Sequence, residues 1–287
     1  MGAPVRITFR ADSESYHLYR AGNADIGSPE VLLLVHGFLG GGEQFIPFMD
    51  QLSQNHPVLS VDLPGHANSP MFTDHRINPK RILKSFSKLL DRISVEFPGG
   101  IHLYGYSMGG RLSLRAALHH QKSLKSLILE GTSPGISDPE ARKERRQEDK
   151  KRADAIRENY TGFLESWKKL PLFTGTKGVT GETDFQERLN GIQRGQNPEN
   201  MAIWLEQFGA GRLESVWGDL DQLEIPVLLL NGKQDTKYAE INRKMMNLLT
   251  HAVHKEIVSA AHRAHIDNPM ETARLVNQFL NYEKSER

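Results

Sequence analysis

Residues 101–110 read IHLYGYSMGG, an aliphatic run followed at once by Gly105-Tyr106-Ser107-Met108-Gly109. The pattern G-x-S-x-G between a strand and a helix is typical of a nucleophile elbow, whose glycines allow the sharp turn that exposes the serine hydroxyl. A chance match in a glycine-rich turn is the alternative. We predict a strand over 101–104, a nucleophilic Ser107 and, behind it, a helix whose first amide, that of Met108, faces the site.

Similar aliphatic runs recur on both sides of the elbow, with helical patterns at 78–97, 111–120 and 238–249 between them. Near-continuous apolar strands are typical of a parallel sheet that helices cover on both faces. The repeated strand–helix order therefore predicts an open α/β fold, whose ligands bind at the carboxyl ends of the strands. The predicted strands are 31–35, 58–61, 101–104, 124–129 and 227–230.

The strand pattern stops between residues 136 and 217, where the sequence is mostly charged and helical. It resumes at 223–230, behind Pro226. We interpret the interval as a helical lid inserted into the core. The predicted organisation is a first part of the α/β core at 1–135, the lid at 136–217 and a second part of the core at 218–287.

Composition limits the partners that this chain is expected to have. The 287 residues include 36 Lys and Arg and 35 Asp and Glu, so a formal net charge of +1 gives no field for nucleic acid. The absence of cysteine excludes thiolate metal sites and cysteine nucleophiles, and it suits a reducing compartment. The beginning of the chain lacks the apolar region of a secretory signal, and no aliphatic run is long enough to cross a bilayer. We expect a soluble, cytoplasmic protein without membrane insertion.

A second donor for negative charge is expected in the loop after the strand at 31–35. Residues 31–42 read VLLLVHGFLGGG, so Phe38 can offer its backbone N–H next to that of Met108. We predict that these two amides form an oxyanion hole. The alternative is an ordinary glycine-rich turn in which His36 is only a buried structural ring.

The serine needs a base and an orienting acid, which follow it in the order acid, then histidine. Asp235 follows the strand at 227–230, and His262 follows a further predicted strand at 255–259. Both side chains therefore lie at the carboxyl ends of late strands, and we predict the triad Ser107–Asp235–His262.

Three other residues compete for these roles. His265 is close to His262, but its offset places it on the following helix. Glu130, at the end of the strand at 124–129, is the alternative acid, while Asp62 is expected to shape a turn.

Arginines near the elbow indicate an anionic ligand. Arg111 begins the helix behind Ser107, where a cation opposes the helix dipole, so a ligand carboxylate is expected nearby. Snorkelling to solvent or pairing with the lid is the alternative. Residues 142–157 hold eight Lys and Arg against four Asp and Glu; most form a solvated face, and two or three are expected to line the cleft.

Taken together, the motifs resemble the 2-succinyl-6-hydroxy-2,4-cyclohexadiene-1-carboxylate synthases of menaquinone biosynthesis, within the α/β-hydrolase superfamily. The resemblance spans residues 31–268. HGF and G-x-S-x-G are general to the superfamily, whereas Arg111 and the lid pattern W-x-x-x-P-x-F are more specific. The motifs are HGFLG (36–40), VDLPGH (61–66), GYSMGGR (105–111), EGTSPGI (130–136), ERRQED (144–149), WKKLPLF (167–173) and QRGQN (193–197).

The resemblance implies an α/β-hydrolase fold and a lyase that eliminates pyruvate from a small tricarboxylate, 2-succinyl-5-enolpyruvyl-6-hydroxy-3-cyclohexene-1-carboxylate, without metal or cofactor. Ser107 is implied as the base, His262 as its proton acceptor and Asp235 as the orienting acid. The implied substrate-binding residues are Arg111, Arg145, Arg194, Tyr106 and Trp167.

Two positions leave the resemblance incomplete. Arg146 is adjacent to Arg145, so the lid register can slip by one residue. Ala261 stands where the family usually has glycine, and its extra methyl group can shift the histidine loop. The alternative functions are a serine esterase, thioesterase or C–C hydrolase of the same fold, and a ligand-binding protein without chemistry.

Overall fold

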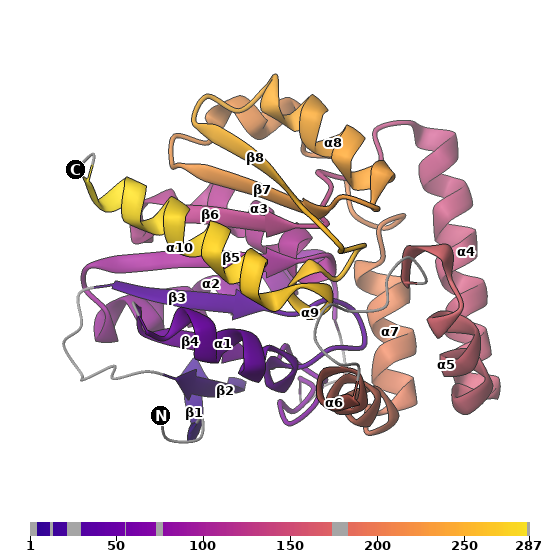
Figure 1. Cartoon of the computed structure of the whole chain (residues 1–287). Helices are drawn as coiled ribbons and strands as arrows, with labels where there is room; N and C mark the ends of the chain where they lie inside the picture. The colour runs from indigo at the N-terminus through magenta and orange to yellow at the C-terminus, as the bar shows by residue number, and fades with distance from the viewer. Residues whose placement is uncertain are drawn as a thin grey trace.

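The computed structural model describes residues 5–11, 14–21, 30–54, 56–72, 77–173 and 183–285. Within these residues one eight-stranded sheet has the order β1-β2-β4-β3-β5-β6-β7-β8 (Figure 1). Strands β3 to β8 are parallel, and β1 and β2 are antiparallel to their neighbours. The strands are β1 (Val5–Ala11), β2 (Glu14–Ala21), β3 (Glu30–Val35), β4 (Val58–Val61), β5 (Gly100–Tyr106), β6 (Leu124–Glu130), β7 (Val227–Gly232) and β8 (Ala252–Ile257).

Helices cover both faces of the sheet. Alternate residues of a strand point to opposite faces, and in a central parallel strand such as β3 the residues on both faces are apolar and buried. In β3, Leu33 and Val35 belong to a core shared with α2, α3 and α8, whereas Leu32 and Leu34 belong to a core shared with α1 and α10. The predicted α/β fold is therefore confirmed. These helices are α1 (Ile46–Leu52), α2 (Pro79–Glu96), α3 (Met108–His120), α8 (Thr236–Met246), α9 (Ala264–Asp267) and α10 (Pro269–Ser285).

Two parts of the sheet differ from the prediction. The predicted set, which rests on aliphatic runs, lacks β1 and β2, whose apolar and polar residues alternate instead. The last strand was predicted at 255–259, whereas β8 spans Ala252–Ile257. This strand lies at the sheet edge, and three of its six residues are exposed, so its sequence carries little apolar signal.

In the part of the chain that the structure describes, four α-helices are inserted between β6 and β7, at the carboxyl ends of the parallel strands (Figure 1). The buried Trp204 indole on α7 donates to the carbonyl of Pro64 at 2.8 Å. Just before α7, the Gln196 amide donates to the carbonyl of Gly40 at 2.8 Å and accepts from the Ala67 amide at 2.9 Å. These bonds join the insertion to two core loops. The inserted helices are α4 (Pro139–Glu158), α5 (Tyr160–Lys168), α6 (Thr183–Arg194) and α7 (Pro198–Phe208).

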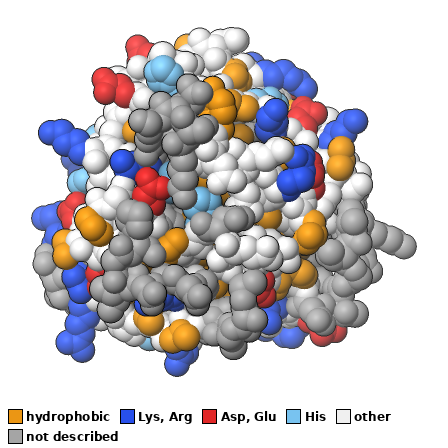
Figure 2. Space-filling model, turned by 60° about the vertical axis from the view of Figure 1, so that its left-hand side comes forward, with side chains coloured by type: hydrophobic (Ala, Val, Ile, Leu, Met, Phe, Trp, Pro, Cys, Tyr) orange, Lys and Arg blue, Asp and Glu red, His pale blue; other side chains and the backbone are white. Residues whose placement is uncertain are grey.

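Charges of both signs are spread over the face seen in Figure 2, rather than gathered into a block of one sign. Among the helices that the structure describes, none combines the length and apolar character needed to span a membrane.

Candidate active site

Ser107 occupies a strained turn between β5 and α3. Its backbone has φ 52° and ψ −108°, a conformation that residues other than glycine rarely adopt. The turn closes tightly, since a Cβ on Gly105 would lie 2.6 Å from the Cα of Gly110. The Ser107 amide donates to the carbonyl of Glu130 at 2.9 Å, which ties the turn to the end of β6. The strand–turn–helix context predicted for the elbow is confirmed.

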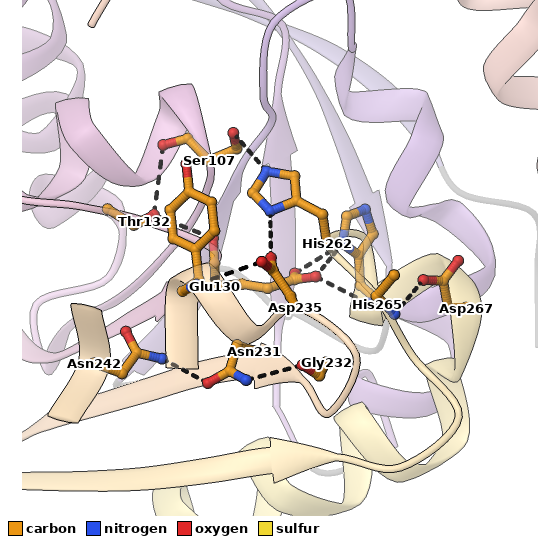
Figure 3. Close-up of polar contacts among 12 residues, drawn as sticks. Ser107, Glu130, Thr132, Asn231, Gly232, Asp235, Asn242, His262, His265 and Asp267 are labelled. Atoms are coloured by element: carbon orange, nitrogen blue, oxygen red, sulfur yellow. Dashed lines mark hydrogen bonds and ion pairs between the residues drawn. The ribbon is translucent and has the colours of Figure 1, made fainter. Parts of the chain in front are cut away.

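The structure brings Ser107, His262 and Asp235 together at the carboxyl ends of β5, β8 and β7 (Figure 3). The Nε2 atom of His262 lies 3.1 Å from Ser107 Oγ, and its Nδ1 lies 2.8 Å from Asp235 Oδ2. A neutral imidazole that donates from Nδ1 to the aspartate can accept the serine proton at Nε2. The arrangement can therefore raise the basicity of the serine oxygen.

Ala261 leaves this geometry intact. It does not adopt a positive φ, so a side chain at this position carries no left-handed strain, and its amide donates to Asp267 Oδ2 at 2.8 Å. The methyl group does not displace the histidine, because His262 reaches both Asp235 and Ser107.

The competing residues are engaged elsewhere. Nδ1 of His265 lies 2.7 Å from a carboxylate oxygen of Glu130, and His265 belongs to α9, as its offset from His262 predicts. Asp62 accepts from the Gly42 and Asn68 amides at 2.6 and 3.1 Å, so it shapes turns.

Phe38 and Met108 both line the cavity at Ser107. Among the described residues, neither backbone amide donates to another backbone group, so both are available to an oxygen in the cavity. His36 fixes the loop before Phe38: one ring nitrogen lies 2.7 Å from the Gly37 carbonyl, and the other accepts from the Leu63 amide at 3.0 Å. Burial lowers the pKa of His36 to about 4, so this ring is neutral and structural.

A cavity of about 410 Å³ lies over the serine, between the core and the inserted helices. Aromatic rings form much of its wall. Trp167 packs edge-on against Phe38 with centroids 5.5 Å apart, and Tyr106 packs against His262 at 5.4 Å. Both predicted aromatic residues, Tyr106 and Trp167, therefore line it. The aromatic lining is Phe38, Tyr106, Trp167, Phe173, Trp204, Phe208, Trp217 and Tyr238.

Arg111 is a buried cation that lines the cavity beside Ser107. It is only 9% exposed, its Nε has no hydrogen-bond partner, and no described carboxylate forms an ion pair with it. Burial lowers the pKa of the guanidinium, as expected for a charge removed from water. The side chain does not snorkel to solvent, and among the described residues of the lid no carboxylate forms an ion pair with it, although the charge of Asp149 acts on it at longer range. A buried cation without an ion-pair partner favours an anion in the cavity.

Two further arginines reach the cavity from α4. Arg145 and Arg152 both line it, and they share the buried Asp149, whose Oδ1 lies 2.8 Å from Arg145 Nε and 3.8 Å from Arg152 Nη1. Arg146 is exposed and lies outside the cavity, so the structure places Arg145 rather than Arg146 there. Arg194, at the end of α6, is also exposed, and the structure does not bring it to the cavity.

Sequence reasoning missed Arg152, Phe173 and Tyr238, which also line the cavity. Arg152 follows Arg145 by seven residues, a helical spacing that places both on one face. Tyr238 packs against His262 with ring centroids 4.7 Å apart, and its amide donates to Asp235 at 3.4 Å. Asp235 is an N-cap residue, and its side chain bonds the amide three residues later, so the capping pattern alone places Tyr238 near the site.

No group of three or more His, Asp or Glu side chains within the described ranges is arranged to hold a metal ion.

The fold and the site define a class of protein: a mostly parallel α/β sheet with a serine, a histidine and an aspartate at its carboxyl edge, beneath inserted helices. A family model described as the alpha/beta hydrolase fold matches residues 30–269, and the chain belongs to this family.

Within that family, the chain resembles one group of enzymes along most of its length. The putative 2-succinyl-6-hydroxy-2,4-cyclohexadiene-1-carboxylate synthase of Bacillus subtilis (strain 168) is 27% identical over 268 residues, which cover 91% of this chain and 94% of that protein. The synthase of Photorhabdus laumondii is 29% identical, with 87% of this chain and 85% of that protein covered. The structure of MenH from S. aureus superposes with a TM-score of 0.86 at 30% identity, covering 95% of this chain and 100% of that chain. The resemblance to these synthases is confirmed at the level of the family.

Proposed function

We propose that this protein is a lyase that eliminates pyruvate from 2-succinyl-5-enolpyruvyl-6-hydroxy-3-cyclohexene-1-carboxylate, giving 2-succinyl-6-hydroxy-2,4-cyclohexadiene-1-carboxylate in cytoplasmic menaquinone biosynthesis. The observation that carries the proposal is the buried guanidinium of Arg111 beside Ser107, which has no ion-pair partner among the described residues. A substrate with three carboxylates uses such a cation, whereas an uncharged ester leaves it desolvated and without a partner. The names of the relatives point to the same reaction.

In the proposed reaction, His262 takes the Ser107 proton, and Asp235 stabilises the imidazolium. The serine oxygen then removes the proton on the carbon next to the succinyl ketone. The amides of Phe38 and Met108 stabilise the enolate oxygen that forms. As the electrons return, the bond between the ring and the ether oxygen breaks and the enolate of pyruvate leaves. It takes up the proton held by the His262 imidazolium, which returns Ser107 and His262 to their starting states. No covalent intermediate forms on Ser107.

We assign Arg111 and Arg145 to substrate carboxylates, with Tyr106 and Trp167 packing against the ring and its substituents. We propose residues 136–217 as the lid that covers the bound substrate. For Arg194 the assignment rests on the resemblance alone, and Arg194→Ala tests it. A loss of kcat/KM of about 10-fold or more, as in Arg111→Ala, supports the assignment, and an unchanged value removes it.

The second candidate function is a serine esterase, thioesterase or C–C hydrolase, since the same serine and oxyanion hole suit acyl transfer. Two assays on one preparation separate the candidates: release of pyruvate from the enolpyruvyl substrate, and hydrolysis of a short activated ester. We expect rapid pyruvate release and poor ester turnover. Rapid ester hydrolysis without pyruvate release would reject the lyase.

A further inference from the structure

A second histidine–carboxylate pair lies behind the proposed triad and takes no part in the proposed reaction. Glu130 and His265 are both 0% exposed, and neither lines the cavity. Nδ1 of His265 lies 2.7 and 3.0 Å from the two Glu130 oxygens, and the His265 amide donates to Oε1 at 3.1 Å (Figure 3). The Tyr104 hydroxyl also donates to this carboxylate. Burial alone would raise the pKa of Glu130, but His265 and these hydrogen bonds together lower it, so the carboxylate is ionised.

Through its backbone, Glu130 also contacts the nucleophile. Its carbonyl accepts from the Ser107 amide at 2.9 Å and from the Thr132 hydroxyl at 3.1 Å. The next residue, Gly131, has φ +55°, and a Cβ there would lie 2.7 Å from Cε1 of His262. The end of β6 therefore supports the serine turn and the catalytic imidazole ring at once.

The His265 ring joins two further loops to this strand end. It lies three residues after His262, on the short helix that follows the histidine loop. Its Nε2 lies 2.9 Å from Gln44 Nε2, in the segment that follows the Phe38 loop. Phe45 and Tyr106 pack against the ring, each with its centroid 4.8 Å away. The ring is thereby fixed between the loops that carry Phe38, Ser107 and His262.

We propose that Glu130 and His265 are positioning residues, a buried clamp that holds the His262 loop against the Ser107 turn and thereby sets the distance from Ser107 Oγ to His262 Nε2. The proposal rests on the roles assigned above to Ser107 and His262. Because the pair does not line the cavity, its loss lowers kcat and leaves KM for the substrate unchanged.

The test is the rate at which a fluorophosphonate modifies Ser107, measured at a temperature where circular dichroism shows each variant to be folded. This rate depends on activation of the serine by His262 and needs no knowledge of the substrate. We expect Glu130→Gln and His265→Gln each to slow labelling by about 10-fold or more, since small displacements of reacting groups cost this much. The double variant is expected to be no slower than the slower single variant, because the two residues act as one unit.

A matched pair at the opposite end of the sheet provides the control. His102 Nε2 lies 3.4 Å from Glu30 Oε2, and these residues belong to the beginnings of β5 and β3. His102→Gln is expected to lower the melting temperature while labelling stays within about 2-fold of the original rate, since His102 lies near the beginning of β5 and the serine turn follows the end of this strand. A purely structural role for Glu130 and His265 predicts the same behaviour for their variants.

The clamp is rejected if folded Glu130→Gln and His265→Gln label as fast as the original protein. Failure of both variants to fold would assign the pair to folding alone and would equally reject it. The outcome is separate from that of the proposed reaction: a protein that releases no pyruvate, yet labels slowly in both variants, keeps the clamp and loses the lyase.

Discussion

Arg111 has opposite consequences for folding and for binding. Its guanidinium is buried, and no carboxylate in the described part of the chain forms an ion pair with it, so burial of this charge costs the folded chain stability. We predict that Arg111→Met raises the melting temperature by about 2 °C or more, since 1 kcal/mol shifts a chain of this size by a few degrees. The same change is expected to lower kcat/KM for the tricarboxylate by at least ~10-fold, the effect of a lost charged hydrogen bond. Thermal melting and steady-state kinetics measure the two effects.

Arg115, one turn further along α3, is the matched control. It is 8% exposed, but it donates to the carbonyls of Arg111 and Glu214. Arg115→Met leaves both carbonyls without this donor, so it is expected to lower the melting temperature. Equal changes of the melting temperature in Arg111→Met and Arg115→Met would show that the buried charge of Arg111 does not destabilise the fold.

At the residue scale, the sequence predicts the position of those side chains that come directly after a strand of the fold. Ser107, Asp235 and His262 each follow a strand, so their meeting at one sheet edge follows from the α/β pattern. Arg194 could not be placed in this way, because where a lid side chain points depends on how the helices pack. Likewise, Glu130 and His265 are far apart in the sequence, so no local sequence pattern predicts their contact.

At the element scale, helix α4 presents two cavity arginines around one buried acid. Asp149 is 2% exposed, bonds Arg145 four residues before it, and accepts from the Gly211 amide at 3.3 Å. We predict that Asp149→Asn releases Arg145 and Arg152 and raises KM for the tricarboxylate by about 10-fold, while kcat changes less, because the serine turn is untouched. Steady-state kinetics measure both constants.

Asp154→Asn, on the same helix, is the control. Asp154 is exposed and pairs with Lys150 at 3.1 Å, and exposed pairs contribute about 1 kcal/mol or less. We expect KM to stay unchanged in this variant. An equal rise in KM for both variants would show that the charge of the helix, rather than the placement of its arginines, matters.

The elements of the core were predictable because burial on both faces gives each parallel strand a continuous aliphatic run. Strand β4, predicted at 58–61, spans Val58–Val61, and β5 extends two residues past its predicted end, to Tyr106. Strands β1 and β2 carry alternation of apolar and polar residues instead, which indicates a strand with one buried face, so a prediction based on aliphatic runs leaves them out.

At the scale of the whole molecule, buried neutral histidines make stability depend on pH. Burial lowers the pKa of His36 to about 4, from 6.5, and that of His66 well below its ordinary value. Between these pH values the unfolded chain binds more protons than the folded one, so stability falls as pH drops from about 6.5 towards 4. Each histidine contributes up to about 1.4 kcal/mol per pH unit. Urea unfolding is expected to give a lower free energy of unfolding at pH 5 than at pH 7. In His36→Gln the difference between the two pH values is expected to be smaller. The same difference in both proteins would contradict the conclusion that His36 is buried in its neutral form.

The near-zero net charge of the whole chain conceals an uneven distribution. A formal charge of +1 gives no general attraction for polyanions, yet Arg111, Arg145 and Arg152 all line one cavity. Small anions are thus expected to bind where large ones do not.

The most direct measurement is a time course of pyruvate released by the purified protein from 2-succinyl-5-enolpyruvyl-6-hydroxy-3-cyclohexene-1-carboxylate, followed with a coupled dehydrogenase alongside the absorbance of the diene product. We predict one pyruvate per diene at a rate far above the uncatalysed reaction, and a loss of about 10³-fold or more in Ser107→Ala, the scale set by removing a triad member. Pyruvate release at the uncatalysed rate, or an equal rate in Ser107→Ala, would contradict the proposed elimination.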